Sequence, residues 1–340
     1  MLKSNSMFIK RWWPAATIII IFAFAPQLFE TFWGRMGMYK LVLLQVFLAN
    51  VVLAQSYRLM TTTGDWTLCH YILMGMGAYT TAILAKFYGV PFYLTIPVAA
   101  ICTVAVSFLI ALPLSRTIGF AFFIGSFALG EFVRYIWEKL HFPFGGSRGL
   151  SNIPRPEMGQ SGDWYFVDFS SRMDISNLYY GTLILAIFAL ILLYRLDTSR
   201  FGNAWKSIYA DSELCESIGI NVTRYRILIF CVAGFFASLA GSLLAYQWGA
   251  IDPDNFGMIE MVYLIIWVVV GGVKTYWGPL IGVASMSLVF ELTRPFDEFR
   301  PLIFGVILIS SLVFMPGGLE VLIPRTTRFF KNLVGTKEVS

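Results

Sequence analysis

Apolar residues recur along this chain in runs of about 20, separated by short polar segments. A helix of that length spans about 30 Å, which matches the hydrocarbon thickness of a bilayer. The alternating ten-residue segments that are typical of membrane β-strands do not recur. The pattern therefore predicts an all-α fold, a polytopic bundle of transmembrane helices.

Ten segments have this character. They lie near residues 13–33, 41–59, 68–88, 92–112, 118–139, 177–197, 226–248, 258–274, 276–293 and 301–323. The eighth and ninth are short and share the tight connection 271–279, so they can form a hairpin that does not fully cross the membrane. We therefore expect eight to ten spans, with ten preferred, in a single membrane domain that covers residues 1–340.

Basic residues indicate which side each polar segment faces, because cytoplasmic loops carry an excess of lysine and arginine. Three segments are basic, namely the N-terminus, the loop 198–225 and the tail 325–340. With ten spans all three lie on one side, so both termini are expected in the cytoplasm. The longest loop, 140–176, then lies outside the cytoplasm, and acidic residues offset its arginines.

Two features leave alternatives open. The tripeptide Ala23-Phe24-Ala25 resembles a signal-peptidase site, but the apolar run continues past it, so an uncleaved first span is preferred. Ten spans also divide into two halves of five with opposite topology, which is a common transporter arrangement, although the halves show no convincing sequence repeat.

The composition agrees with a membrane protein, since 57% of the residues are hydrophobic and 13% are charged. That charge is about half of what an average soluble domain carries. The net charge of +5 fits cytoplasmic loops and anionic lipid, not nucleic acid. The four cysteines and two histidines have no metal-ligand spacing, and no P-loop is present. We therefore expect no bound metal or cofactor, and no ATP hydrolysis by this chain.

The segment 202–221 is a mixed polar and apolar stretch between two predicted spans. Its apolar residues on one side of a helical wheel are Ala204, Ile208, Cys215 and Ile218. Asp211 is a candidate helix cap and Gly219 a candidate stop signal. Because a polar segment held between spans is where a membrane protein meets a soluble partner, we expect a partner to bind here.

Charged residues within the predicted spans are few, which makes each of them a candidate for function. Glu131 and Arg134 share a helical face, and they form either a structural pair or part of a pathway or gate near the outer end. His70 is better explained as a polar contact at a helix end than as a proton relay. Three further charged residues are expected at the membrane interface: Glu260, Glu291 and Arg294.

Six segments carry recognisable motifs, in order along the chain. They are 63–79, 127–134, 145–154, 199–222, 252–256 and 271–279. Residues 127–134 are similar to a pattern L-A-x-G-E-I-x-R, and residues 145–154 fit a pattern G-G-S-x-G-L-x-x-I-P. Together the segments resemble the LivM-type inner-membrane permeases of branched-chain amino acid ABC importers. The ordered series extends from about residue 50 to about residue 290.

The resemblance implies a role for the segment 202–221. Permeases of ABC importers carry a cytoplasmic coupling helix with a degenerate E-A-A-x-x-x-G pattern, whose spacing Glu213 and Gly219 match. The residues implied in this ATPase-coupling loop are Gly202, Lys206, Ile208, Asp211, Glu213, Cys215 and Gly219. The chain departs from the family pattern at Tyr209, Leu214 and Cys215, which is expected to retune the contact with the ATPase.

The same resemblance implies an inner-membrane permease subunit of an ATP-driven transport complex, not an enzyme in itself. The implied cargo is a branched-chain or other hydrophobic amino acid, and the residues of a translocation path or gate would be His70, Glu131 and Arg134. Cys69 and Arg148 replace the family's usual residues, which is expected to alter the path or the solute.

The implied partners are a second related permease, two ATP-binding subunits that hold ATP and Mg, an extracytoplasmic solute-binding protein, and membrane lipid. Urea or short amides are the alternative cargo, because related permeases carry them. From other classes, the alternatives are an ion-coupled secondary transporter and a non-transporting membrane scaffold. No carboxylate lies clearly in mid-span, which disfavours ion coupling.

Overall fold

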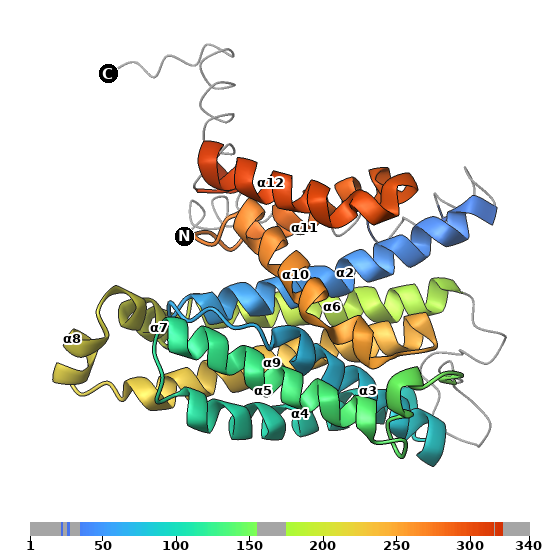
Figure 1. Ribbon diagram of the computed structural model, residues 1–340, viewed down its shortest axis with the longest axis horizontal. Helices are drawn as coiled ribbons and strands as arrows, with labels where there is room; N and C mark the ends of the chain where they lie inside the picture. Colours follow the sequence, from blue (N-terminus) through green and yellow to red (C-terminus); the bar gives the residue numbers. More distant parts are fainter. Residues whose placement is uncertain (1–21, 23–25, 28–34, 155–174, 316, 322–340) are drawn as a thin grey trace, which may run out of the picture.

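The computed structural model describes residues 22, 26–27, 35–154, 175–315 and 317–321. Within these ranges the regular elements are helices, and one isolated antiparallel bridge joins Leu150 to Ile251. Most of the long helices run along the long axis of the molecule, and α10 crosses that axis obliquely (Figure 1). The predicted all-α bundle is confirmed.

Nine helices of at least 14 residues form the bundle in the described part of the chain. They are α2 (Arg35–Thr61), α3 (His70–Tyr88), α4 (Phe92–Leu114), α5 (Phe120–Lys139), α6 (Ile175–Asp197), α9 (Val222–Trp248), α10 (Met258–Gly271), α11 (Gly278–Leu292) and α12 (Arg300–Phe314). They correspond to the second to tenth predicted spans. The first predicted span lies almost wholly outside the described residues, as do the tail 325–340 and most of the loop 140–176.

Six stretches among the described residues are long and apolar enough to cross a membrane. They are Tyr39–Thr61, Phe92–Leu114, Phe120–Lys139, Leu178–Asp197, Val222–Trp248 and Pro253–Gly271. Helices α11 and α12 are apolar but have only 15 residues each, or about 22 Å of helix. The helices support a multi-pass membrane protein, whereas the count of ten spans and the side of each terminus stay predictions.

Helix α12 ends at Phe314, well before the predicted end of that span near residue 323. The sequence that follows is Met315-Pro316-Gly317-Gly318, and proline and glycine are poor at continuing a helix. The length of the apolar run therefore predicted a longer helix than the one that forms, because the run continues past the proline and the glycines.

Helix α9 lies at the centre of the bundle and packs against α2, α3 and α4. Small residues recur every four positions along it, at Ala233, Ala237, Gly241 and Ala245, and this small-residue stripe is buried throughout. A Cβ atom at Gly241 would lie 1.9 Å from the carbonyl oxygen of Met74 in α3. The stripe therefore allows close contact between two helix backbones, as small residues do in membrane bundles.

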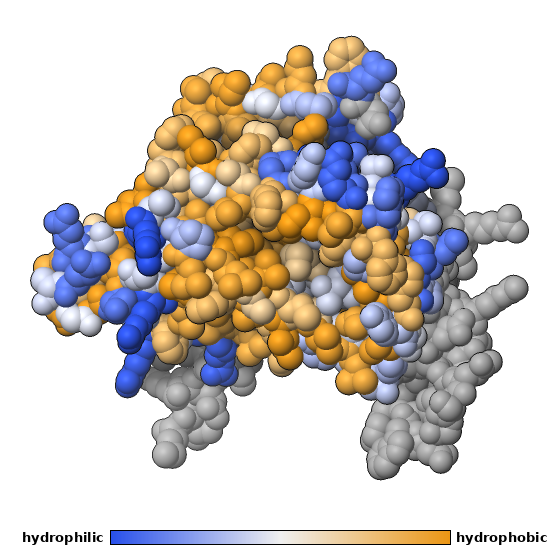
Figure 2. All heavy atoms as spheres, turned by 60° about the horizontal axis from the view of Figure 1, so that its bottom comes forward, coloured by the Kyte–Doolittle hydropathy of each residue, from blue (hydrophilic) through white to orange (hydrophobic). Residues whose placement is uncertain are grey.

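Apolar side chains cover most of the exposed face between the ends of the bundle, as Figure 2 shows. Hydrophilic side chains gather at the protruding end, which is formed by α7 (Arg200–Ala210) and α8 (Ser212–Ser217). An apolar belt with polar groups toward its ends matches a surrounding bilayer.

The end of the bundle opposite α7 and α8 holds two of the sequence motifs together (Figure 1). Leu150 and Ile251 exchange two backbone hydrogen bonds, of 2.7 and 2.8 Å. Gly149 has a φ of +63°, and a Cβ there would lie 2.0 Å from the carbonyl oxygen of Ile251, so only glycine fits. The glycine-rich segment 145–154 is thereby fixed beside the start of the segment 252–256.

Candidate functional site

The segment 202–221 forms two short helices, α7 and α8, that protrude from one end of the bundle (Figure 1). Ser199 caps α7 by accepting the N–H of Gly202, and Asp211 caps α8 by accepting the N–H of Leu214 at 2.9 Å. Gly219 follows α8 with a φ of +90°, a conformation that favours glycine. The predicted cap at Asp211 and stop at Gly219 are present, and Asp211 also separates the two helices.

Buried contacts fix α7 and α8 to the bundle. The Trp205 side chain is fully buried, and its indole Nε1–H donates to the Tyr225 carbonyl at 3.1 Å. Ile208 of α7 and Cys215 of α8 are buried together against Val222 at the start of α9. The two helices therefore form an anchored projection.

The apolar face differs from the one predicted. Ile208 and Cys215 are buried as expected, whereas Ala204 is half-buried and Ile218 is 71% exposed. The reason is the extended backbone of Asp211, with a φ of −160°, which interrupts the helix on which the predicted face depended. Trp205, which the pattern did not single out, is the main anchor.

Apolar side chains are also exposed on this projection. They are Phe201, Tyr209, Leu214 and Ile218, which we call the α7–α8 surface. The acidic residues Asp211, Glu213 and Glu216 are exposed on the same two helices. Exposed apolar side chains with charged neighbours are typical of a surface that binds another protein.

An ion cluster, buried at Arg58 and Asp197 and half-exposed at Lys206, connects α7 to the bundle. Asp197, at the end of α6, lies 3.1 Å from the Lys206 ammonium and 3.4 Å from the Arg58 guanidinium of α2. Arg58 is buried and also donates from Nε to the Val273 carbonyl at 3.2 Å, in the connection between α10 and α11. The cluster therefore links the projecting helix α7 to that connection.

A second buried ion pair joins the α2–α3 connection to α9. Arg226 Nε lies 3.2 Å from Asp65 Oδ2, and both residues are buried. Burial raises the pKa of the Asp65 carboxyl, while the Arg226 guanidinium and the hydrogen bond from the Thr63 hydroxyl oppose that rise. The ring of Tyr209 lies against Gly64, next to Asp65, so α7 also touches this connection.

Glu320 closes the connection between α10 and α11 from beyond α12. Its carboxylate accepts the backbone N–H groups of Lys274 and Thr275, at 3.1 and 2.9 Å, and the Thr275 hydroxyl. Glu320 is only 5% exposed. The segment after α12 therefore fixes the same connection that Arg58 contacts.

His70 and the Glu131–Arg134 pair, the predicted path or gate residues, make separate sets of contacts. His70 is fully buried, with its Nε2 2.9 Å from the Ser56 hydroxyl of α2. Arg134 pairs with Glu131 at 2.8 Å, and it reaches Asp254 of the 3₁₀ helix η2 (Pro253–Phe256) at 3.2 Å. The Arg134 contacts tie α5 to the start of α10.

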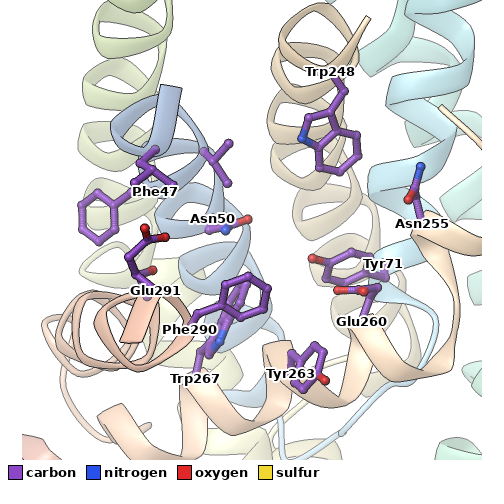
Figure 3. Close-up of a pocket in the computed structure, with 13 residues that line it drawn as sticks. Phe47, Asn50, Tyr71, Trp248, Asn255, Glu260, Tyr263, Trp267, Phe290 and Glu291 are labelled. Atoms are coloured by element: carbon purple, nitrogen blue, oxygen red, sulfur yellow. The ribbon is translucent and has the colours of Figure 1, made fainter. Parts of the chain in front are cut away.

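A pocket of about 330 Å³ lies between α2, α3, α9, α10 and α11 (Figure 3). Six aromatic residues line it, namely Phe47, Tyr71, Trp248, Tyr263, Trp267 and Phe290. Its polar lining is Asn50, Asn255, Glu260, Ser287 and Glu291. Because Trp248 ends α9, the pocket reaches the half of the bundle away from α7 and α8.

None of His70, Glu131 and Arg134 lines this pocket. The sequence predicted Glu260 and Glu291 at the membrane interface and not in a pocket. The pocket could not be predicted, because its other lining residues come from helices that are distant in the sequence. The signal in the sequence is a carboxylate, Glu260, with Phe256 before it and Tyr263 and Trp267 after it at helical spacing. Among the described residues, no group of three or more His, Cys, Asp or Glu side chains has metal-binding geometry.

A multi-pass helical bundle with an anchored polar projection at one end and a small aromatic pocket toward the other is the architecture of a membrane transport component. A family described as the permease component of the branched-chain amino acid transport system matches residues 40–315, and this chain belongs to that family.

The relatives of this chain include transport permeases with different named solutes. The permease protein LivM of a high-affinity branched-chain amino acid transport system from Salmonella typhimurium is 29% identical over 258 aligned residues, and the match covers 72% of this chain and 61% of the relative. The chain thus spans 61% of the length of that protein and of its Escherichia coli counterpart.

Two shorter similarities cover less than half of the chain. The permease protein LivH from Escherichia coli is 28% identical over 137 residues, 40% of this chain and 44% of the relative. The fructose import permease FrcC from Rhizobium meliloti is 27% identical over 144 residues, 39% of each chain. No solved structure is significantly similar to this chain.

Proposed function

We propose that this chain is the inner-membrane permease subunit of an ABC importer that carries branched-chain or other hydrophobic amino acids into the cytoplasm. The family match over most of the chain supports the permease role, and the LivM relatives support the amino acid cargo. ATP and Mg would bind to partner subunits and not to this chain. The similarity to LivH supports a second, related permease as a partner.

The α7–α8 surface is the observation that carries the proposal. It offers exposed apolar side chains on a short helix, beside acidic residues, on a projection whose own buried face is fixed to the bundle. A helix with an exposed apolar side suits a groove on an ATPase subunit. We place this end of the bundle in the cytoplasm, as the basic residues of the loop 198–225 indicate.

The ion cluster gives the proposed coupling a physical route. Closure of the ATPase subunits would displace α7 and α8, and Lys206 would carry that displacement to Asp197 and Arg58. Arg58 contacts the connection between α10 and α11, which are two of the helices that line the pocket. Such a rigid coupling favours an exchange between outward-open and inward-open arrangements of the bundle. An extracytoplasmic binding protein would deliver the solute to the opposite end.

The test is ATP-dependent uptake by the complete complex. The chain is expressed with its candidate second permease, ATPase subunits and binding protein, purified as one assembly and reconstituted in vesicles. Uptake of radiolabelled leucine, isoleucine, urea, fructose and galactose is then compared with and without ATP. We expect ATP-dependent uptake of the hydrophobic amino acids.

Each contrary result has a distinct meaning. Uptake that persists without any ATPase subunit overturns the ABC assignment and favours an ion-coupled transporter. ATP-dependent uptake of urea alone would favour the alternative cargo, and uptake of a sugar would align the chain with its fructose-permease relative.

A further inference from the structure

The pocket between α2, α3, α9, α10 and α11 contains a buried donor that the described part of the protein leaves unused. Trp267 is 7% exposed, and its indole Nε1–H has no acceptor among the described residues. A buried N–H without a partner is costly, so such a group is expected to meet water or a ligand. Asn50 of α2 also lines this pocket, which adds an amide to its polar groups (Figure 3).

Two charged residues line the pocket, Glu260 and Glu291, and both are carboxylates. They differ in whether another side chain already neutralises them. Glu291 is bound by Arg294 at 3.7 Å and by the Tyr39 hydroxyl at 3.1 Å. Glu260 forms no ion pair within 4 Å among the described residues, although Arg300 interacts with it electrostatically at longer range. Arg300 instead stacks 4.0 Å over the Phe290 ring. Glu260 is therefore the lining carboxylate that is left to accept a cationic group.

Apart from Asn255 and Ser287, the remaining wall is aromatic and apolar. Phe47 comes from α2, Trp248 from the end of α9 and Phe290 from α11, and the three lie on different sides of the pocket (Figure 3). Aromatic faces stabilise both apolar groups and ammonium ions. The volume of about 330 Å³ is at the small end of ligand sites, which suits a small solute.

We propose that this pocket binds the transported solute inside the permease, as a zwitterionic amino acid with an apolar side chain. The ammonium group pairs with Glu260, the carboxylate accepts the Trp267 Nε1–H, and the apolar side chain lies against the aromatic lining, Phe290 included. The assignment rests on the proposed function and adds to it a solute site within this chain. A lipid acyl chain would use neither polar group, and a neutral amide would not need the Glu260 carboxylate.

The kinetic test compares two carboxylates in the complete, reconstituted complex. Glu260→Gln keeps the size of the side chain and removes its charge, and Glu298→Gln makes the same change on an exposed residue outside the pocket. We expect Glu260→Gln to raise the KM for leucine by about tenfold or more, because a charged hydrogen bond is lost, and Glu298→Gln to leave it unchanged. Trp267→Phe, which keeps an aromatic ring, should raise the same KM.

An unchanged KM for leucine in Glu260→Gln overturns the inference, while uptake by the unsubstituted complex shows that the proposed function still holds. If the unsubstituted complex takes up no amino acid, the proposed function itself has failed, and a second measurement is then needed for the pocket.

That second measurement does not depend on transport. Ser287 lines the pocket from α11, so a Ser287→Cys variant of the complex is treated with a thiol reagent, with and without leucine, and compared with the unsubstituted chain. We expect leucine to slow the modification of the introduced cysteine in a concentration-dependent manner. Modification that saturating leucine leaves unchanged overturns the site. Modification that lipid blocks and leucine does not affect assigns the pocket to an acyl chain instead.

Discussion

Arg58 and Asp197 form an ion pair in which both side chains are buried, so the loss of one partner leaves the other as a buried charge. Replacing Arg58 with Met leaves the Asp197 carboxylate with only the half-exposed Lys206 as a partner. We expect a loss of about 3–5 kcal/mol in stability, seen as a lower melting temperature of the solubilised protein. The double variant Arg58→Met with Asp197→Leu should recover most of that loss, since no buried charge then remains.

Arg134→Met is the matched control for this prediction. The pairs of Arg134 with Glu131 and Asp254 are partly exposed, so the loss of each should cost no more than about 1 kcal/mol, less in total than the loss expected for Arg58→Met. If Arg58→Met melts like the unsubstituted protein, the buried pair does not stabilise the bundle.

The two kinds of ion pair also differ in how well the sequence predicts them. The spacing of three residues on one helix allows Glu131 and Arg134 to pair, which was one of the two predicted alternatives, and they do pair at 2.8 Å. Arg58 and Asp197 lie on helices far apart in the chain, so no local spacing joins them. The same holds for Glu320 and for the lining of the pocket, which depend on how distant helices pack.

At the scale of the helix, the contact between α3 and α9 depends on the absence of a side chain at Gly241. We expect Gly241→Ala to destabilise the protein by about 1–3 kcal/mol, because its Cβ would overlap the Met74 carbonyl oxygen. Gly181→Ala in α6 is the control, because its Cβ meets nothing within 4 Å, and it should raise stability by up to about 1 kcal/mol. Thermal melting distinguishes the two, and equal effects would mean that α3 and α9 pack less closely.

Helix α8 is where the ATPase is expected to bind. The double variant Leu214→Glu with Ile218→Glu should weaken binding of the ATPase subunit at least about tenfold, since each buried apolar side chain contributes roughly 1.5–3 kcal/mol. Leu214→Met with Ile218→Val keeps the surface apolar and should bind normally. Co-purification and binding in detergent measure the effect. Full binding by the double glutamate variant would place the ATPase elsewhere.

The long helices could be predicted from the sequence, because an apolar run of about 20 residues is rarely anything but a membrane-spanning helix. The small-residue stripe of α9 can also be read from the sequence, because small residues recur there every four positions. The division of the segment 202–221 into α7 and α8 was not predictable in this way, because the sequence indicates Asp211 only as the cap of a single helix. Its side chain does cap α8, but its extended backbone also ends α7.

For the whole molecule, the orientation in the membrane is the main prediction that the sequence makes and the structure does not decide. Cysteines introduced at Ser212 and Ser151, in separate variants, should be modified by an impermeant reagent from opposite sides. Ser212 should react from the cytoplasmic side and Ser151 from the outer side, as the positive-inside rule requires. Reaction of both from one side would mean that the number of spans between them is even.

The short helices α11 and α12 have a consequence for the lipid around them. Each provides about 22 Å of helix against a hydrocarbon layer of about 30 Å, so the bilayer beside them must thin or their ends must lie below the headgroups. Phe290 and Glu291, which line the pocket, belong to the last turn of α11. A locally thin membrane would bring water closer to the pocket, and lipid chain length would then affect how readily a polar solute enters.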